Sequence, residues 1–422
     1  MREDQIMGLG FSMWFPLGLN KKKAKERYIE FFQNLSSVVP NWDTSSFFDD
    51  EGFWVKLVPF EEEIYGEWKD GKLCVSARTN SAGPGYHAYL IDLLDGIGIA
   101  PLKVEDETGY YHDRNFTLLQ EEMTNWLKVL GGNILEMSED GENKNLAVSL
   151  STDWYPVTEG FTNCPLGHFE KDFFKRMMNG EDTGSEFFIW WNRPQDAAFF
   201  KNCAMNLIWC ENNWLPPETD PEANIIAATL GCLEKAYALD PGLGYPLAEW
   251  SELAQLWKTK GYEPMSDALE RLRSSSGDIG EPRCGYKRGQ IIQNIRGWHL
   301  TRSGMMHYEQ DENSDIWWDD DLTIRTSIIS VRFDKKVANK SEALLNSVTE
   351  EEEDCEPFTL RTPEIAACIQ HTQIEEDGEL FFQTRLFAAL DNELMLMSLY
   401  YPDAKDRQRA IDVCASVTRQ EK

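Results

Sequence analysis

Residues 1–160 mix two hydrophobic periodicities, so this part of the chain is expected to contain both helices and strands. Its strongest turn signal is Lys69-Asp70-Gly71, because Asp-Gly accepts the positive φ angles of a tight hairpin. The predicted strands of that hairpin are Glu63–Trp68 and Lys72–Thr79. Helices are predicted at Tyr86–Ile97 and at Asn115–Leu130, where Gly131-Gly132 would end the second.

Residues 161–283 are predicted to be mostly helical. The stretch Ala223–Asp240 looks like the second helix and exit turn of a tetratricopeptide unit, but no partner repeat follows at the required spacing. A lone helical hairpin is therefore expected. The segment Ser274–Asp278 has the composition of a linker and predicts a boundary, so deleting residues 284–422 is expected to leave a soluble folded fragment.

Residues 284–422 return to strand patterns. A helix is predicted at Lys340–Val348, and the acidic residues at 350–356 are expected to form an exposed loop. The predicted strands are Ile291–His307 and Ile316–Phe333 around a polar turn at Asp311–Ser314, although Trp317–Leu322 interrupts the second. A hairpin of Leu380–Leu390 and Leu394–Tyr400 is predicted around Asp391-Asn392. The whole chain thus predicts an α+β protein of two to three domains, with antiparallel sheets, packed helices and a mostly helical middle.

The chain closes with an antiparallel hairpin and a helix that is opened by Pro402-Asp403 and faces the core through Ala410, Val413, Cys414 and Val417. This arrangement resembles the end of PsbP/DcrB-like domains, clearly over about the last 40 residues. PsbP/DcrB-like domains are generally binding modules or chaperones without catalytic residues, so the resemblance implies such a role. It transfers no site residue.

Charge narrows the choice of partners. The chain has 422 residues and a net charge of −31, which repels phosphate backbones and disfavours direct binding to nucleic acid. The same field attracts cationic proteins and speeds their encounter. The alternative is that the acidic residues only keep a large protein soluble.

The nine cysteines form no C-x-x-C pair, and most have apolar neighbours, so they are interpreted as reduced thiols in a cytoplasm. The stretch Met1–Phe15 lacks the apolar core of a signal peptide, and no segment is apolar enough to span a membrane. A cytoplasmic location is expected.

The segment Ser76–His87 places glycines between a strand end and a helix start, where backbone N–H groups can hold an anion. Arg78 could clamp that anion through two hydrogen bonds. The candidate anion-binding residues are Arg78, Asn80, Ser81, Gly83, Gly85 and His87. The alternative is a capped turn in which Gly85 only permits close packing.

His87 could also form an acid/base pair with His112-Asp113, although each is more simply a structural residue and Asp113 stands where a helix N-cap is expected. No metal and no cofactor are predicted. The possible ligands Cys164 with His168, His299 with His307, and Asp319-Asp320-Asp321 lack the required further members. The P-loop-like string from Gly66 to Lys72 lies across the predicted hairpin and is discarded, and no nucleophile motif is found.

Adjacent tryptophans on a strand point to opposite faces, so one of each pair needs a second covering surface. Trp190, Trp191, Trp317 and Trp318 are therefore candidates for binding a partner. The function predicted from the sequence is a non-enzymatic cytoplasmic protein-binding factor, an adaptor, chaperone or toxin-immunity-like protein with an acidic surface. The alternative is an enzyme or small-anion or nucleotide binder centred on Arg78 to His87.

Overall fold

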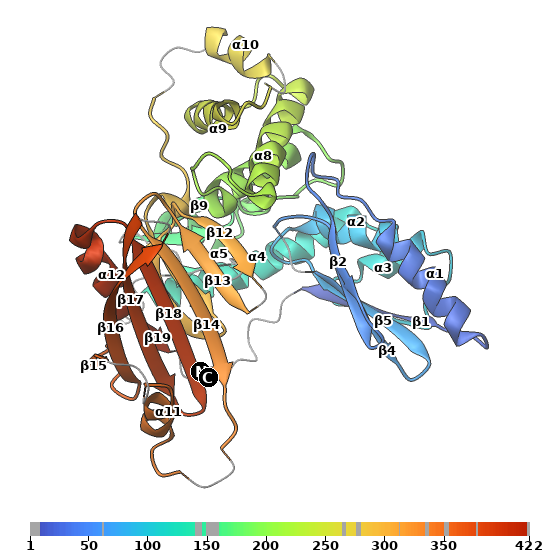
Figure 1. Ribbon diagram of the computed structural model, residues 1–422. Coiled ribbons are helices and arrows are strands. Elements are labelled where there is room, and N and C mark those ends of the chain that lie inside the picture. Colours follow the sequence, from blue (N-terminus) through green and yellow to red (C-terminus); the bar gives the residue numbers. More distant parts are fainter. Residues whose placement is uncertain are drawn as a thin grey trace. The chain divides into compact units, whose positions relative to one another are not determined.

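The computed structural model describes residues 9–60, 63–139, 146–148, 160–263, 267–275, 280–311, 313–333, 337–349, 354–376 and 379–419. It confirms the α+β class, with antiparallel sheets packed against helices (Figure 1). The chain forms two compact units, and neither is one continuous segment. The first comprises 1–151, 157–212 and 220–285, and the second 152–156, 213–219 and 286–422. The predicted segments 1–160 and 161–283 thus lie largely in one unit.

The first unit contains a six-stranded antiparallel sheet. The predicted hairpin is confirmed, since Asp70 and Gly71 both adopt positive φ angles, 50° and 73°, between its strands. In spatial order the strands are β2 (Ser45–Phe48), β3 (Gly52–Lys56), β4 (Ile64–Lys69), β5 (Lys72–Arg78), β1 (Gly10–Pro16) and β6 (Lys103–Asp106).

Helices cover one face of this sheet. The α1 residues Tyr28 and Phe32 are buried against Phe15 and Phe53, which point to the inner face from β1 and β3. Burial of such aromatic side chains is the main source of stability here. The helices of this part are α1 (Lys21–Gln33), α2 (Pro84–Asp95), α3 (Tyr110–Asp113) and α4 (Phe116–Glu139).

The expectation that Gly131-Gly132 ends α4 is wrong, because the helix runs on to Glu139. Gly131 serves close packing instead. A Cβ atom added there would lie 2.9 Å from the Phe174 carbonyl oxygen of α5, whereas one on Gly132 would meet nothing within 4 Å. A glycine pair can mark either a helix end or a helix contact, and the sequence pattern does not separate them.

The rest of the first unit is mostly helical, as predicted. The stretch compared with a tetratricopeptide unit lies in α8, which ends just before Asp240-Pro241 and packs against α9. Of the predicted linker, Ser274 and Ser275 close α10 and residues 276–278 lie outside the described residues. The elements are β7 (Leu146–Ala147), β8 (Phe161–Cys164), β9 (Gly167–Glu170), α5 (Lys171–Met178), α6 (Gly184–Phe187), α7 (Ala197–Asn206), the π-helix η1 (Leu207–Glu211), α8 (Asp220–Leu239), α9 (Leu247–Thr259) and α10 (Ala268–Ser275).

The second unit is built on a seven-stranded antiparallel sheet and a smaller three-stranded one. The large sheet has the order β12 (His307–Asp311), β13 (Ser314–Trp318), β14 (Thr323–Ser330), β18 (Glu393–Tyr401), β17 (Glu379–Leu390), β16 (Ala366–Glu376), β15 (Glu356–Pro357). The small one has the order β10 (Gln290–Ile295), β11 (Trp298–Ser303), β19 (Thr418–Arg419), and the helical elements are η2 (Tyr286–Arg288), α11 (Lys340–Thr349), η3 (Ala404–Asp406) and α12 (Arg407–Ala415).

One long strand over Ile291–His307 was a wrong expectation. Arg296 and Gly297 take positive φ angles of 52° and 88° and turn the chain back on itself, which makes β10 and β11 a hairpin. Arg-Gly is a weaker turn signal than Asp-Gly, because arginine seldom adopts a positive φ. The predicted hairpin at Asp391-Asn392 and the helices over Lys340–Val348 and after Pro402 are confirmed.

Residues 213–219 belong to the second unit although they are flanked in sequence by the first. The guanidinium of Arg288 lies 3.4 Å from the centre of the Trp214 ring, and the Asn213 amide donates to the Met306 carbonyl at 3.4 Å. Trp214 is buried. This short segment therefore depends on chain that follows 70 or more residues later.

The interpretation of all nine cysteines as reduced core thiols is wrong. Cys355 and Cys368 form a disulfide that joins the residue before β15 to β16. The other seven are free thiols, two of which, Cys74 and Cys284, are only partly buried. Glu350–Glu353 of the acidic run lie outside the described residues, while Asp354 and Glu356 are exposed.

Candidate functional site

The Arg78 turn connects β5 to α2. Arg78 is the last residue of β5 and is exposed, and Asn80 and Ser81 are partly buried. Gly83 has a φ of 109°, which favours glycine, and helix α2 starts at Pro84. Gly83, Gly85 and His87 are buried. Only the first half of the predicted anion site is therefore open to solvent.

The space beside Gly83 and Gly85 is occupied by other residues of the protein. A Cβ atom on Gly83 would lie 2.7 Å from Phe188 Cβ, and one on Gly85 would lie 1.9 Å from Trp190 Cδ1. The Gly85 N–H donates to the Trp190 carbonyl and the Trp190 N–H to the Ala82 carbonyl, both at 2.9 Å. These glycines thus admit the Phe188–Trp190 segment rather than a ligand, which corrects the prediction of an anion cradle at Gly83 and Gly85.

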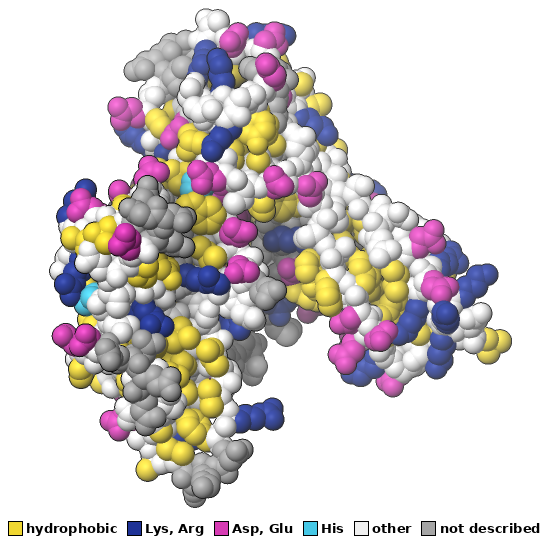
Figure 2. All heavy atoms as spheres, viewed as in Figure 1, with side chains coloured by type: hydrophobic (Ala, Val, Ile, Leu, Met, Phe, Trp, Pro, Cys, Tyr) yellow, Lys and Arg dark blue, Asp and Glu magenta, His cyan; other side chains and the backbone are white. Residues whose placement is uncertain are grey.

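Arg78 belongs to the outer face of the sheet, opposite the helices. Phe47, Trp54 and Tyr65 are cross-strand neighbours on that face, and Phe47 and Tyr65 are 52% and 48% exposed. Apolar side chains are visible over β2 and β4 in Figure 2. The arginine therefore borders an aromatic surface.

His87 forms a buried polar network, and His112-Asp113 is not part of it. Its Nδ1 lies 2.8 Å from Thr79 Oγ1, and its Nε2 lies 3.1 Å from Thr108 Oγ1 and 3.3 Å from Asp106 Oδ1. The two hydroxyls donate elsewhere, Thr79 to the Leu9 carbonyl and Thr108 to Asp106. Both ring nitrogens therefore have hydrogen-bonding partners inside the protein. His112 is exposed on α3.

Asp106 is the counter-ion of His87. Burial acts to raise the pKa of its carboxyl, but the hydrogen bond from His87, the positive charge of that ring and the N–H of Tyr111 outweigh it and lower the pKa to about 2. No catalytic nucleophile or cofactor position adjoins the pair among the residues described. Its role is to fix α2 against β6.

The expectation that Asp113 caps the following helix is wrong. Asp113 ends α3, and the side chain of Asn115 accepts hydrogen bonds from the N–H groups of Thr117 and Leu118 at 3.1 and 3.3 Å. Either residue type can cap a helix, and the two positions differ by only two residues.

The four candidate tryptophans have different environments. Trp190 is 1% exposed and does not lie on a strand; its ring packs on Phe199 with centroids 4.2 Å apart. Trp191 is partly buried and stacks on Phe188 at 5.9 Å. Trp317 is 2% exposed in the core of the second unit. Trp190 and Trp317 are thus core residues, which leaves Trp191 and Trp318 as candidates for a partner surface.

Trp318 lies on β13 beside an acidic group. Its indole Nε1 donates to Glu218 Oε2 at 3.0 Å, and its ring faces His307 of β12 with centroids 5.3 Å apart. Glu218 also lies 3.8 Å from His307 Nε2. Glu218 comes from the 213–219 segment, about 100 residues before Trp318, so no local pattern in the sequence reveals it.

Further carboxylates lie along the β12–β13 hairpin and in the turn that follows it, and together with Glu218 we name them the acidic edge. Asp319 turns the chain from β13 to β14 by accepting from the N–H groups of Asp321 and Leu322, so the three aspartates form a turn. Arg409 pairs with Asp319 at 2.5 Å. In Figure 2 acidic side chains are visible where Figure 1 places β12 and β13. The acidic edge comprises Glu218, Glu309, Asp311, Asp315, Asp319, Asp320 and Asp321.

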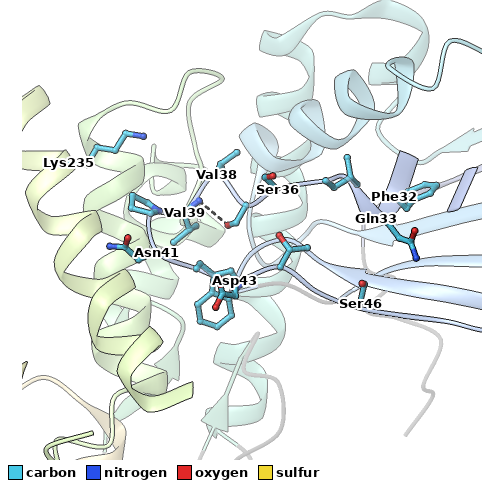
Figure 3. Close-up of a pocket in the computed structure, with 14 residues that line it drawn as sticks. Phe32, Gln33, Ser36, Val38, Val39, Asn41, Asp43, Ser46 and Lys235 are labelled. Carbon is cyan, nitrogen blue, oxygen red and sulfur yellow. Dashed lines mark hydrogen bonds between the residues drawn. The ribbon is translucent and has the colours of Figure 1, made fainter. Parts of the chain in front are cut away.

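The structure also has a polar groove that sequence reasoning missed. It has a volume of about 690 Å³ and is formed by the end of α1, the chain from there to the start of β2, and Lys235 of α8 (Figure 3). Asp43 accepts from Asn224, and the Lys235 ammonium lies over the Phe200 ring. Its charged groups thus have partners within the protein, and the groove presents no catalytic arrangement.

The residues considered as possible metal ligands form no group of three or more among the residues described. Cys164 and His168 lie on the β8–β9 hairpin, where His168 Nδ1 is 2.8 Å from Asn163 Oδ1. His299 is on β11 and His307 on β12, in different sheets. Within the described ranges, no three His, Cys, Asp or Glu side chains are grouped as a metal site requires. Nor does any helix in those ranges combine the length and apolarity that a membrane crossing needs.

Comparison with known proteins gives little to add to this geometry. No family model matches the chain, and no curated protein matches it. A crystal structure from Bacteroides thetaiotaomicron VPI-5482 is similar with 13% identity and a TM-score of 0.24, over 32% of this chain and 46% of that one. The chain thus spans about half the length of that protein.

A solution structure of cyanobacterial PsbP (CyanoP) from Synechocystis sp. PCC 6803 is similar with 9% identity and a TM-score of 0.19, over 34% of this chain and 97% of that one. At these TM-scores neither likeness supports a conclusion about function.

Proposed function

We propose that this protein is a non-enzymatic protein-binding factor that binds a cationic partner at the acidic edge of its second unit. The observation that carries the proposal is the partly exposed Trp318 held by Glu218 among the carboxylates of β12, β13 and the following turn. Tryptophan supplies contact area at the centre of interfaces, and surrounding charges select the partner.

The net charge of the chain supports the same partner chemistry. A protein of charge −31 accelerates the encounter with a basic partner and slows that with an acidic one. Arg325 pairs with Asp311, and Arg409 pairs with Asp319 and Asp321, so these two cations offset part of the charge of the seven carboxylates in the acidic edge. An adaptor, a chaperone and a toxin-immunity protein would all use such a surface.

Two finer proposals accompany this one. We propose that residues 284–422 form a binding module that is PsbP/DcrB-like at its end, supported by the β17–β18 hairpin followed by α12. We also propose a cytoplasmic location, supported by seven free thiols and opposed by the Cys355–Cys368 disulfide. Alkylating the cysteines of intact cells before lysis tests the location, since a disulfide already formed in most molecules would argue against it.

The binding function is tested by capture with a matched charge control. The variant Asp320→Lys with Asp321→Lys should capture at least about tenfold less cationic protein than wild type, because it reverses charge at the acidic edge. The control, Glu121→Lys with Glu122→Lys on α4, makes the same change in net charge at exposed positions elsewhere. Equal capture by both variants would contradict the proposal. Capture should also fall as salt rises from 0.05 to about 0.5 M.

A further inference from the structure

The strand β12 stands at one end of the seven-stranded sheet, so it is an edge strand among the residues described. Its residues Glu309, Gln310 and Asp311 are exposed. An edge strand carries backbone N–H and C=O groups that a further strand can pair with.

The hairpin register identifies which backbone groups point outward. Asp311 and Ser314 are paired across only two intervening residues, and in such a hairpin the flanking residues form a hydrogen-bonded pair. Hydrogen-bonded and non-hydrogen-bonded pairs alternate along the ladder, so the Gln310–Asp315 pair is of the second kind. The N–H and C=O of Gln310 are therefore directed away from β13, at the edge of the sheet.

The side chains of this edge define what a partner strand would carry. Glu309 and Asp311 share one face, and Tyr308 and Gln310 share the other. The Tyr308 ring stacks on Trp317 at 5.6 Å, and its hydroxyl donates to Asp315. A strand added here would place alternate residues beside two carboxylates and beside an aromatic and an amide.

We propose that the partner of the acidic edge binds as an extended segment that adds a strand to β12, with cationic residues alternating with apolar ones. This inference rests on the proposed function and specifies its mode of binding. Main-chain hydrogen bonds to Gln310 would supply the docking geometry. Glu309, with Asp311 and its partner Arg325 two residues further on, would select lysine or arginine on one face of the added strand.

The test uses the full-length chain and a synthetic fluorescent nonapeptide of alternating lysine and valine, with binding followed by anisotropy. The same peptide with an N-methyl group on every valine has the same charge but lacks half of its main-chain donors. It should bind at least about tenfold more weakly, because two or more net hydrogen bonds are lost. A peptide of alternating glutamate and valine should not bind.

Two protein variants locate the site. Gln310→Pro removes the outward N–H and is tolerated on an edge strand, so it should weaken binding about tenfold while Gln310→Ala stays within about threefold of wild type. If N-methylation and Gln310→Pro leave affinity unchanged while Asp320→Lys with Asp321→Lys abolishes it, strand addition is overturned and the acidic binding surface stands. If the lysine-valine peptide does not bind at all, the inference fails, whereas the proposed function fails only in the capture experiment.

Discussion

His87 and Asp106 form a buried polar pair, and two threonine hydroxyls contact the same imidazole ring. Removing polar groups from water is costly, and the hydrogen bonds of this network offset that cost. The pair joins helix α2 to β6 and to the end of β5. The stability of the first unit should therefore depend on the protonation of Asp106.

The variant Asp106→Asn tests this dependence. The pKa of Asp106 is lowered from 3.8 to about 2 in the folded protein, so the unfolded chain binds the proton more tightly. The stabilisation is complete above pH 4 and is lost as the pH falls toward 2. Wild type should lose about 2 kcal/mol more than the variant over that window. Urea unfolding of both proteins between pH 5 and 2 measures the difference, and parallel curves would contradict the assignment.

The sequence predicted that His87 matters but not with which partners. Asp106 and Thr108 follow it by 19 and 21 residues, beyond the end of α2, and no periodicity links them. Glu218 and Trp318 present the same difficulty over a longer separation. Polar contacts of this kind depend on the packed fold, so single-residue chemistry was predictable while its geometry was not.

At the level of elements, turns with Asp-Gly and Asp-Asn signals were found correctly, and ambiguous glycines were not. Arg296-Gly297 and Gly131-Gly132 show the two kinds of failure. Gly297 makes a turn, but the arginine before it is not a residue typical of turns. Gly131-Gly132 looks like a helix end but lies inside α4. In both cases contacts made elsewhere in the fold decide the outcome.

Gly131 and Gly132 offer a matched pair of substitutions. Gly131→Ala should destabilise the protein by about 1–3 kcal/mol, because the new methyl group would press on the backbone of α5. Gly132→Ala should instead raise stability by about 0.5–1 kcal/mol, since alanine favours the helix and the added carbon meets open space. Chemical denaturation of the two variants gives both numbers, and changes of the same sign would show that α4 and α5 do not pack as described.

On the scale of the whole molecule, the second unit includes short pieces of chain that are flanked in sequence by the first. The sequence placed a boundary near residue 283, close to the change of unit at 285–286. It gave no sign that residues 213–219 belong with the later part, because a short Trp- and Pro-containing stretch reads as an ordinary loop.

Truncation after residue 285 should therefore have a mixed result. The fragment should keep a cooperative unfolding transition, since the first unit has its own core. It should also self-associate, because Trp214 loses the cover of Arg288. Calorimetry and light scattering measure the two effects, with a fragment carrying Trp214→Ser as the control for association. Absence of any cooperative transition would mean that the units share one core.

The dependence of Trp214 on Arg288 has a consequence for synthesis on the ribosome. These residues are 74 positions apart, so at about 5–20 residues per second the tryptophan leaves the exit tunnel roughly 4–15 s before its cover does. During that interval the nascent chain displays an apolar side chain that the finished protein hides. Ribosome-associated chaperones would meet this segment first, and slowing translation between the two positions should lower the yield of folded protein.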